Sequence, residues 1–504
     1  MLKLLFLGFS AGIPLSLIFG TLSLWLVEAD IKKSTVTLFG LATLGYSFKF
    51  VWAPLVDRLP LPLLSKLLGQ RRAWLLVAQL AIMAVLLVMA NINPLGGGTP
   101  LQLLALAAVA LGFSSATQDI VIDAYRIETA TIKYQAILAA MYMGGYRVAM
   151  IASGAGALFL AEHFGTTIDT YQFSAWTKTY TCMAVLMMVG IATTLMIKEP
   201  DVQRSDSTDW QVSDYLRFLT LFILMVVTMV FVYVFSSGLA NEAKQALSEV
   251  FNNKHLAAFL VASTRLVSAL AGAGLMGILA VKGGLTNREM VARTYVEPVT
   301  DFFSRYGIKV ALLLLALIGL YRISDIVLGM IANVFYYDEM GYSKKQIAAA
   351  SKTFGVAMTI FGGFVGGALA LRYGVIKLLF VGAILSASTN LLFIWLYYQG
   401  NDLLPLYIVL SVDNLSQGLS LSVFIAFLSS LTNVSFTAIQ YAIFSSLMTF
   451  FPKVLGGYSG AFVEAIGYPA FFTFTALIGV PILWLVWKIS QYVRDGKLIQ
   501  ASTT

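Results

Sequence analysis

The sequence predicts an all-α integral membrane protein with fourteen membrane-spanning helices, arranged as two six-helix bundles and a central pair. Three observations predict this class. The 504 residues are 59% hydrophobic and only 12% charged, whereas soluble domains carry about 25% charged residues. Apolar stretches of about 20 residues, which is the length that crosses a bilayer, recur along the whole chain. Two similar halves flank a central insert, as in transporters built from repeats.

The N-terminal bundle is predicted in residues 1–200. Its six apolar stretches are separated by short polar loops, and they are 4–27, 36–56, 74–92, 101–124, 135–160 and 175–197. The first stretch is longer than the core of a typical signal peptide, so we expect it to be a membrane span.

The central domain is predicted in residues 201–295. It begins in the polar stretch 198–214, "KEPDVQRSDSTDWQVSD", and contains two further spans at 215–236 and 256–281. Between these spans, "NEAKQALSEVF" has apolar and polar residues at the spacing of a short amphipathic helix, which is predicted on the outer surface.

The C-terminal bundle is predicted in residues 296–504. A stretch at its start, 290–306, combines apolar and charged residues at helical spacing, which predicts a helix along the inner membrane face. Six spans follow, at 309–335, 346–371, 376–398, 404–430, 437–461 and 468–489.

The loop charges predict the orientation. With both termini in the cytoplasm, the inner loops hold most of the 33 Lys and Arg residues, whereas the outer loops hold lysines and no arginine. Basic residues are retained on the cytoplasmic side. The net charge of +8 therefore reflects topology, and no dense basic run suggests a nucleic acid as partner.

The sequence lacks the residues that several kinds of chemistry require. Cys182 is the only cysteine, and the two histidines, His163 and His255, fall in predicted loops, so neither a disulfide nor a metal site is expected. No Walker A pattern is present, which disfavours an ATP-driven pump. We expect no cofactor and no catalytic residues.

A similar loop motif occurs in both halves of the sequence. "APLVDRLPLPLLSKLLGQRRAWLL" (53–76) follows the second span, and "GGFVGGALALRYGVIKLL" (362–379) occupies the matching place in the second half, so that Arg58 and Arg372 correspond. A short basic loop with glycine resembles the loop between helices two and three of the major facilitator superfamily. The resemblance implies that Asp57 and Arg58 clamp the cytoplasmic helix ends in one conformational state.

Charged residues within the spans indicate a function, because a charge in hydrocarbon is costly unless it is paired, protonated or hydrated. In "GFSSATQDIVIDAY" (112–125), Asp119 and Asp123 lie on one helix face, and Arg126 joins them. Counting 1.5 Å per residue from the inner border places Asp119 and Lys49 at similar depths, roughly 10 and 13 Å. We therefore expect Lys49 to pair with Asp119 when the bundles close, and Asp123 and Arg126 to act as gating residues.

Other buried cations are predicted at one level in the outer half of the membrane: Arg147, Arg322 and Lys352. Asp325 is one turn from Arg322 and is expected to neutralise it. A central cavity whose walls carry more cations than anions would attract an anionic solute.

Several stretches together resemble the AmpG-type muropeptide permeases of Gram-negative inner membranes. They include "GFSAGIPLSLIFGTLSLWL" (8–26), "YSFKFVWAPLVDR" (46–58), "SSATQDIVIDAY" (114–125) and "GGYRVAM" (144–150). The resemblance implies proton-driven import of N-acetylglucosaminyl-1,6-anhydro-N-acetylmuramyl sugars with or without peptide. It implies that Asp119 is the proton-coupling carboxylate, and that the residues which bind substrate are Lys49, Gln118, Arg147, Lys352, Tyr46 and Asn414.

Other functions remain open at this stage. Acetyl-coenzyme A transporters share this branch and also carry an anionic ligand, and a facilitator of the same fold for another solute is a further alternative. A membrane enzyme would need a catalytic cluster at one interface, and only Asp123, Arg126 and Glu128 come close to one. The expected partners are an anionic sugar-peptide, protons and lipid, and the protein is expected to be a monomer.

Overall fold

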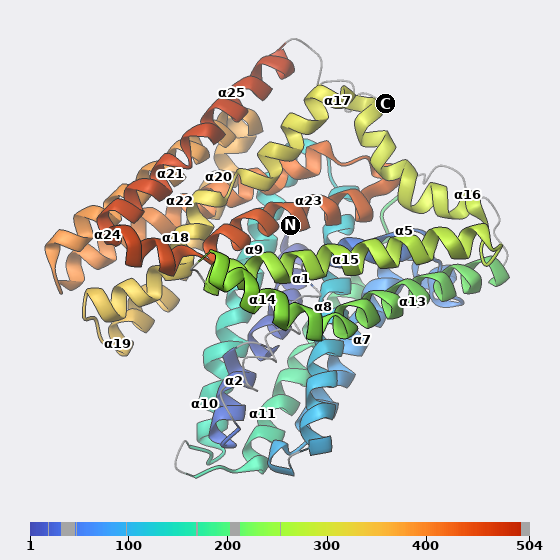
Figure 1. Ribbon diagram of the computed structural model, residues 1–504, viewed down its shortest axis with the longest axis horizontal. Coiled ribbons are helices and arrows are strands. Elements are labelled where there is room, and N and C mark those ends of the chain that lie inside the picture. Colours follow the sequence, from blue (N-terminus) through green and yellow to red (C-terminus); the bar gives the residue numbers. More distant parts are fainter. Residues whose placement is uncertain are drawn as a thin grey trace. The chain divides into compact units, whose positions relative to one another are not determined.

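The computed structural model is helical throughout the residues that it describes, which are 1–18, 20–31, 46, 48–96, 98–167, 170–201, 212–251 and 254–494 (Figure 1). The prediction of an all-α class is confirmed. The chain divides into two compact units. The larger unit comprises residues 1–203 and 303–504, and the insert unit comprises residues 204–302. The exact domain boundaries stay a prediction.

The N-terminal bundle is built from residues 1–203 of the larger unit. Its helices are α1 (Leu2–Ile18), α2 (Gly20–Glu28), α5 (Ala53–Arg58), α6 (Leu64–Leu68), α7 (Gln70–Ala90), α8 (Gly98–Glu128), α9 (Gln135–Ile151), α10 (Ala157–His163), α11 (Phe173–Leu186) and α12 (Met188–Met196). A short 3-10 turn, η2 (Lys49–Val51), precedes α5, and a π-helical turn, η5 (Ala152–Gly156), joins α9 to α10.

The C-terminal bundle follows the insert unit. Its helices are α17 (Glu297–Leu320), α18 (Ile323–Val334), α19 (Lys344–Ile347), α20 (Gly355–Tyr373), α21 (Val375–Gln399), α22 (Leu403–Leu431), α23 (Thr437–Gly456), α24 (Ser459–Leu477) and α25 (Val480–Arg494). Two π-helical turns occur here, η7 (Phe335–Glu339) after α18 and η8 (Ala348–Phe354) before α20. Gly307 has φ 72° inside α17, and this break separates residues 297–306 from the span that follows.

The insert unit contains α13 (Val212–Phe235), α14 (Ser237–Val250), α15 (Lys254–Lys282), α16 (Arg288–Val291) and the π-helical turn η6 (Ala292–Val296). Arg265 of α15 holds the end of α13. Its Nη2 donates to the carbonyl oxygen of Tyr233 at 2.6 Å, and its guanidinium lies 4.2 Å from the centre of the Tyr233 ring. The amphipathic stretch predicted between the two spans is the helix α14.

Within the described ranges, twelve helices are long and apolar enough to cross a membrane. The sequence predicts fourteen. Most of the predicted span 36–56 lies outside the described residues. The predicted span 256–281 corresponds to α15, of which Val267–Lys282 qualifies as a shorter apolar helix. The protein is therefore a multi-pass membrane protein.

The two bundles of the larger unit meet at a seam, defined by the contacts of α9 with α20 and α22 and of α5 and α8 with α23. The seam lies at one end, which we call the basic end because Arg58, Arg71 and Arg126 lie there. The first turns of α9 touch the last turns of α20, since the backbone of Ile137 approaches Gly367.

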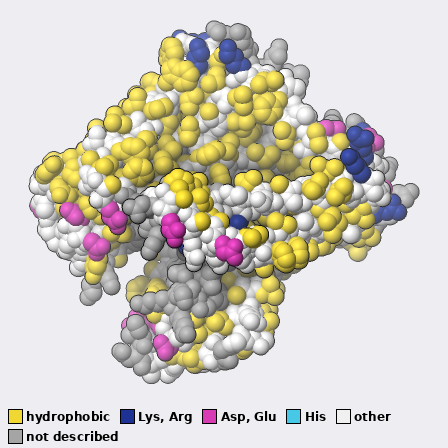
Figure 2. Space-filling view, in the orientation of Figure 1, with side chains coloured by type: hydrophobic (Ala, Val, Ile, Leu, Met, Phe, Trp, Pro, Cys, Tyr) yellow, Lys and Arg dark blue, Asp and Glu magenta, His cyan; other side chains and the backbone are white. Residues whose placement is uncertain are grey.

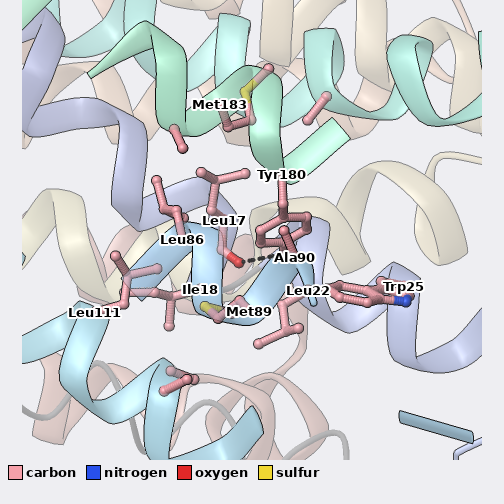
Figure 3. Packing of buried hydrophobic residues seen from close by; sticks show 14 of the residues in the cluster. Leu17, Ile18, Leu22, Trp25, Leu86, Met89, Ala90, Leu111, Tyr180 and Met183 are labelled. Carbon is pink, nitrogen blue, oxygen red and sulfur yellow. Dashed lines mark hydrogen bonds between the residues drawn. The ribbon is translucent and has the colours of Figure 1, made fainter. Parts of the chain in front are cut away.

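Tightly packed apolar side chains hold the N-terminal bundle together on the side away from the seam. Leu17, Ile18, Leu22 and Trp25 of the first two helices pack against α7, α8 and α11 (Figure 3). Tyr180 reaches into this cluster and donates a hydrogen bond of 3.1 Å to the carbonyl oxygen of Leu17. Close packing without polar gaps favours a rigid bundle that moves as one body.

The surface fits a lipid environment. Hydrophobic side chains are spread widely over the face in Figure 2, while Lys and Arg gather near the labels of α17, α25 and α16, and acidic side chains near α19, α24 and α14. A surface of this kind is unfavourable in water, because exposing apolar area to water raises the free energy.

Glycines allow α20 and α22 to pack with their backbones in contact. A side chain on Gly362 would collide with the carbonyl oxygen of Leu415. We expect Gly362→Val to force these helices apart, at a cost of about 1–3 kcal/mol for overpacking, and to lower the melting temperature in detergent. Gly329→Val is the control, because nothing lies within 4 Å of its added Cβ. Equal melting temperatures for both variants would contradict this packing.

Candidate functional site

A group of buried charges lies on α8 beside the seam. Lys49 Nζ in η2 lies 3.5 Å from Asp123 Oδ2, and Arg126 Nη2 lies 3.7 Å from Asp123 Oδ1. The expected pairing of Lys49 with Asp119 is wrong in this structure. The depth count treated residues 49–58 as one straight helix, whereas the helix is interrupted at Trp52. The lysine side chain also spans about one turn, so both carboxylates are within its range.

Asp119 is 8% exposed and forms no ion pair within 4 Å among the described residues. Tyr142 of α9 donates a long hydrogen bond of 3.4 Å to its Oδ1. Lys49 attracts Asp119 electrostatically and Asp123 repels it. A buried carboxyl held only weakly, between a cation and a second carboxylate, is able to change its protonation state when its neighbours move.

Two further predicted residues surround Asp119. The hydroxyl of Tyr46 donates to Ser115 Oγ at 2.6 Å, one turn before Asp119 on α8. Gln118 is fully buried, and its amide oxygen and nitrogen have no hydrogen-bond partner in the described part of the chain. A buried amide without partners costs free energy, as is expected of a group whose partner is a water molecule or a ligand.

Arg126 connects the bundles across the seam. Its Nη1 donates to Gln135 Oε1 at 2.7 Å and to Ser429 Oγ of α22 at 2.9 Å. Its guanidinium also lies 5.2 Å from the centre of the Tyr441 ring of α23. The side chain is completely buried, so these bonds form in a medium where charged hydrogen bonds are strong. The sequence identified Arg126 as a gating residue but not its partners.

We expect Arg126→Gln to weaken the closure of the basic end. Ala140 lies in the seam, with its Cβ 3.9 Å from the Cβ position of Gly363. In a Cys182→Ser, Ala140→Cys background, the rate of labelling by a charged thiol reagent should rise about tenfold, which corresponds to about 1.4 kcal/mol. The control is Lys133→Gln, a cation at the same end whose recorded contact is the ring of the adjacent Tyr134. Unchanged labelling in Arg126→Gln would refute a role in closure.

The sequence analysis named no partners for the predicted clamp residues Asp57 and Arg58, and the structure gives them different ones. Asp57 Oδ1 lies 2.6 Å from Arg71 Nη2, and the same guanidinium binds Glu128 Oε1 at 2.5 Å. Arg58 instead lies 5.4 Å from the centre of the Phe436 ring, in the other bundle. The residues after Asp57 leave the helix and loop back, which brings Arg71 to a carboxylate fourteen positions earlier.

The sequence analysis missed Arg71, Glu128 and Glu199 as members of one network. Glu199 accepts hydrogen bonds from the backbone amides of Arg71 at 2.8 Å and Arg72 at 3.1 Å, and so caps the N-terminus of α7. Gly69, at φ 88°, leaves no room for a side chain beside Glu199. The signal available in the sequence was Asp57, an acid near a helix end for which the sequence analysis named no partner.

Arg147, Lys352 and Asn414 lie further from the basic end. Arg147 lines a space of about 10 Å³ between α9, α20 and α22, with Thr359, Gly363 and Ser422, which is close to the volume that one water molecule needs. Asn414 Oδ1 accepts from Thr359 Oγ1 at 3.1 Å. Lys352 belongs to the π-helical turn η8, and its side chain lies outside the described part of the structure.

The expected ion pair between Arg322 and Asp325 is not formed within 4 Å among the described residues. Asp325 Oδ2 accepts from Ser386 Oγ at 3.2 Å, although Arg322 still attracts Asp325 electrostatically. The spacing of three residues suggested one helical turn, but Arg322 precedes the first residue of α18 and lies outside the helix.

Comparisons with known proteins agree with the fold. The family model described as "Acetyl-coenzyme A transporter 1" matches residues 1–96. An AmpG transporter of Rickettsia felis is 30% identical over 98% of this chain and 97% of its own length. The anhydromuropeptide permease of Escherichia coli K12 is 29% identical over 97% of this chain and 80% of its own length.

Solved structures resemble the chain in fold alone. The proton:xylose symporter XylE has a TM-score of 0.56 at 13% identity and covers 97% of this chain and 93% of its own. The transporter FucP in its outward conformation has a TM-score of 0.59 at 10% identity and covers 97% of both chains. The chain has the fold of transporters of the major facilitator superfamily, and the relatives that match almost its full length are named as a transporter and a permease. Within that superfamily, the chain belongs to the AmpG family of permeases.

Proposed function

We propose that this permease imports anhydro-muropeptides, that is, N-acetylglucosaminyl-1,6-anhydro-N-acetylmuramyl sugars with or without peptide, by proton symport. The transport would cross the bacterial inner membrane for recycling of the cell wall, with both termini in the cytoplasm. The protein would act as a monomer. The observation that carries the proposal is the position of Asp119, which is buried beside the seam with no ion pair to any described residue, in a relative of an anhydromuropeptide permease.

The substrate would bind between the bundles and contact Lys49, Gln118, Arg147, Lys352, Tyr46 and Asn414. Gln118 supports this role through its unpartnered amide, and Arg147 through its place between the bundles. The gating residues would be Asp57, Arg58, Asp123 and Arg126, which join helices at the basic end. Opening toward the cytoplasm requires the contacts of Arg58 with Phe436 and Arg126 with Ser429 to break.

A second candidate substrate is acetyl-coenzyme A, because residues 1–96 match a family described by that transport activity. Both solutes are anionic, and the buried cations suit either of them. The relatives that cover almost the full chain favour the muropeptide.

The test is uptake by the purified protein in proteoliposomes under an imposed inward proton gradient. One radiolabelled anhydro-muropeptide and acetyl-coenzyme A should be supplied separately. Accumulation of the muropeptide that collapses with a protonophore supports the proposal. Accumulation of acetyl-coenzyme A alone would transfer the assignment to the second candidate, and muropeptide uptake that ignores the gradient would remove proton symport.

A further inference from the structure

The interior of the C-terminal bundle contains two carboxylates without an ion pair to any described residue. Asp325 of α18 and Asp413 of α22 are 5% and 4% exposed, and no described cation lies within 4 Å of either. A carboxylate at such a place is costly unless it is paired, protonated or bound to an ion. The surroundings of these two side chains should therefore show how the charge is compensated.

Side chains of α21 connect the two carboxylates. Ser386 Oγ donates to Asp325 Oδ2 at 3.2 Å. Thr389, one turn further along α21, donates to Asp413 Oδ1 at 3.2 Å, and Gln417 Nε2 donates to Asp413 Oδ2 at 2.8 Å. The helices α18, α21 and α22 therefore meet at one group of buried polar side chains. We call it the carboxylate cluster, and it comprises Asp325, Ser386, Thr389, Asn390, Asp413 and Ser416.

Three buried oxygen atoms of the carboxylate cluster have no hydrogen-bond partner among the described residues: Asp325 Oδ1, Asn390 Oδ1 and Ser416 Oγ. The amide nitrogen of Asn390 donates to Ser324 Oγ at 2.9 Å, which places this amide beside Asp325. Ser416 lies on the face of α22 that carries Asp413, three residues earlier, and that face contacts α21. Carboxylate, amide and hydroxyl oxygens are ligands of hard cations. The partner that these oxygens lack is therefore a hydrogen-bond donor or a cation.

The charges around the carboxylate cluster do not balance. Arg322 precedes α18 and lies three residues before Asp325, so one guanidinium stands against two carboxylates. The remaining charged residue of α18, α21 and α22 is Lys377 in the first turn of α21. It is nine residues before Ser386, which is roughly 13 Å along the helix. One negative charge is therefore left uncompensated.

Neighbouring helices do not supply the missing charge through their described side chains. Tyr321 after α17 and Tyr336 of η7 face the carboxylate cluster, and a tyrosine carries no charge at pH 7. Arg147 of α9 meets the other face of α22. Lys453 of α23 and Glu464 of α24 are exposed. An excess negative charge in the interior of a bundle calls for a bound positive charge.

We propose that the carboxylate cluster binds one monovalent cation, a proton or Na⁺, which joins α18, α21 and α22. The site goes beyond the proposed function and does not depend on the muropeptide assignment. One positive charge brings the net charge of Asp325, Asp413 and Arg322 to zero, and it provides the partner that the three oxygens lack. A proton would reside on one carboxyl group and supply one donor, whereas Na⁺ would contact several of the oxygens at once.

The experiment measures the binding of radioactive Na⁺ and the thermal unfolding of the purified protein in nanodiscs, without a solute to transport. Na⁺ is exchanged for choline at constant ionic strength and pH, and the pH is varied separately without Na⁺. If the cation is Na⁺, an excess of about 100-fold over its dissociation constant should shift the unfolding equilibrium toward the native state by a similar factor. If it is a proton, stability is present at low pH and is lost as the pH rises, because the native state holds a proton that the unfolded state releases.

Asp325→Asn removes one negative charge and keeps the shape of the side chain, so that no cation is needed. Its amide oxygen still accepts from Ser386, and its amide nitrogen supplies a donor in place of the cation. The melting temperature should equal that of the cation-saturated wild type, and the response to Na⁺ or to pH at this site should vanish. Asp402→Asn is the matched control, because Asp402 is an exposed helix cap, and it should respond as the wild type does. Should Asp325→Asn not fold, Asp413→Asn removes the same charge and carries the same expectation.

Ser416→Ala distinguishes the two cations. It removes an oxygen that binds no described residue, so the dissociation constant of Na⁺ should rise by about tenfold, as expected for one lost contact with a charged group. A proton held on a carboxyl group needs no further ligand, so the pH dependence should stay as in the wild type. The control is Ser388→Ala on α21, which removes an exposed hydroxyl that donates to the carbonyl oxygen of Ile384 at 2.8 Å.

Two results would overturn the proposal. No bound Na⁺, together with the same pH dependence in the wild type and in Asp325→Asn, would leave water as the partner of the three oxygens. Bound Na⁺ that persists in Asp325→Asn, or that Ser416→Ala does not weaken, would place the ion elsewhere. Because no solute is present in these measurements, neither result bears on the import of muropeptides, which the uptake assay tests separately.

Discussion

Replacement of Asp119 by Asn should abolish the accumulation of substrate that an inward proton gradient drives, while exchange of substrate across the membrane continues. The amide keeps the shape of the carboxyl and can still accept the hydrogen bond from Tyr142, but it cannot bind or release a proton. With one proton transported per solute, a gradient of one pH unit supports an accumulation of about tenfold. In Asp119→Asn the concentration ratio should fall to about one, because no free energy is coupled.

Accumulation is measured in proteoliposomes with an imposed pH gradient, and exchange by counterflow in the same vesicles without it. Asp402→Asn is the matched control. Asp402 is at the N-cap of α22, where its Oδ1 accepts from the amide of Leu404, and Asn caps a helix equally well. Gradient-driven accumulation that survives in Asp119→Asn would move the coupling to another carboxylate, with Asp325 and Asp413 of the C-terminal bundle as the next candidates.

The second large effect is expected for Arg71→Met. Arg71 is 1% exposed and neutralises Asp57 and Glu128 at once. Removal of the cation takes away the positive charge that Asp57 and Glu128 share in a buried network, and breaking a buried ion pair typically costs about 3–5 kcal/mol. We expect a lower melting temperature and a lower yield of folded protein, measured by thermal denaturation in detergent and by size-exclusion chromatography.

A rescue experiment checks the cause of that loss. Asp57→Asn/Glu128→Gln in the Arg71→Met background removes both uncompensated charges and should recover part of the stability, because the three residues act as one network. Arg72→Met is the control. Arg72 donates to the carbonyl oxygens of Thr194 and Leu195 at the end of α12, so its loss leaves no buried carboxylate unpaired. If Arg71→Met and Arg72→Met are equally stable, the network does not hold the fold.

The fold was largely predictable from the sequence because a bilayer requires each span to be an apolar helix of about 20 residues. Twelve of the fourteen spans predicted from length and apolar character correspond to helices of the described residues that are long and apolar enough to cross a membrane. The buried charges Asp119, Asp123 and Arg126 could also be found, since a charged residue in an apolar stretch is conspicuous. Their depth followed from a count of residues along one continuous helix.

The partners of those charges could not be predicted, because pairing depends on how helices approach and where they break. Lys49 pairs with Asp123 because the second span is interrupted at Trp52. Arg322 is outside α18 for a similar reason. Arg71 reaches Asp57 through a loop whose path no periodic pattern indicates. Breaks inside spans, rather than the spans themselves, therefore decide the chemistry of the site.

The π-helical turns η5 and η8 have a mechanical consequence. Each adjoins a helix of the seam, α9 or α20, on the side away from the basic end. A π turn is less favourable than an α turn and is often found at functional sites, so bending of these helices will concentrate there. The segments beyond η5 and η8 can then tilt at these turns, while the segments on the side of the basic end keep their contacts in the seam. If the outer segments close before the seam separates, the path of the solute is never open at both ends at once.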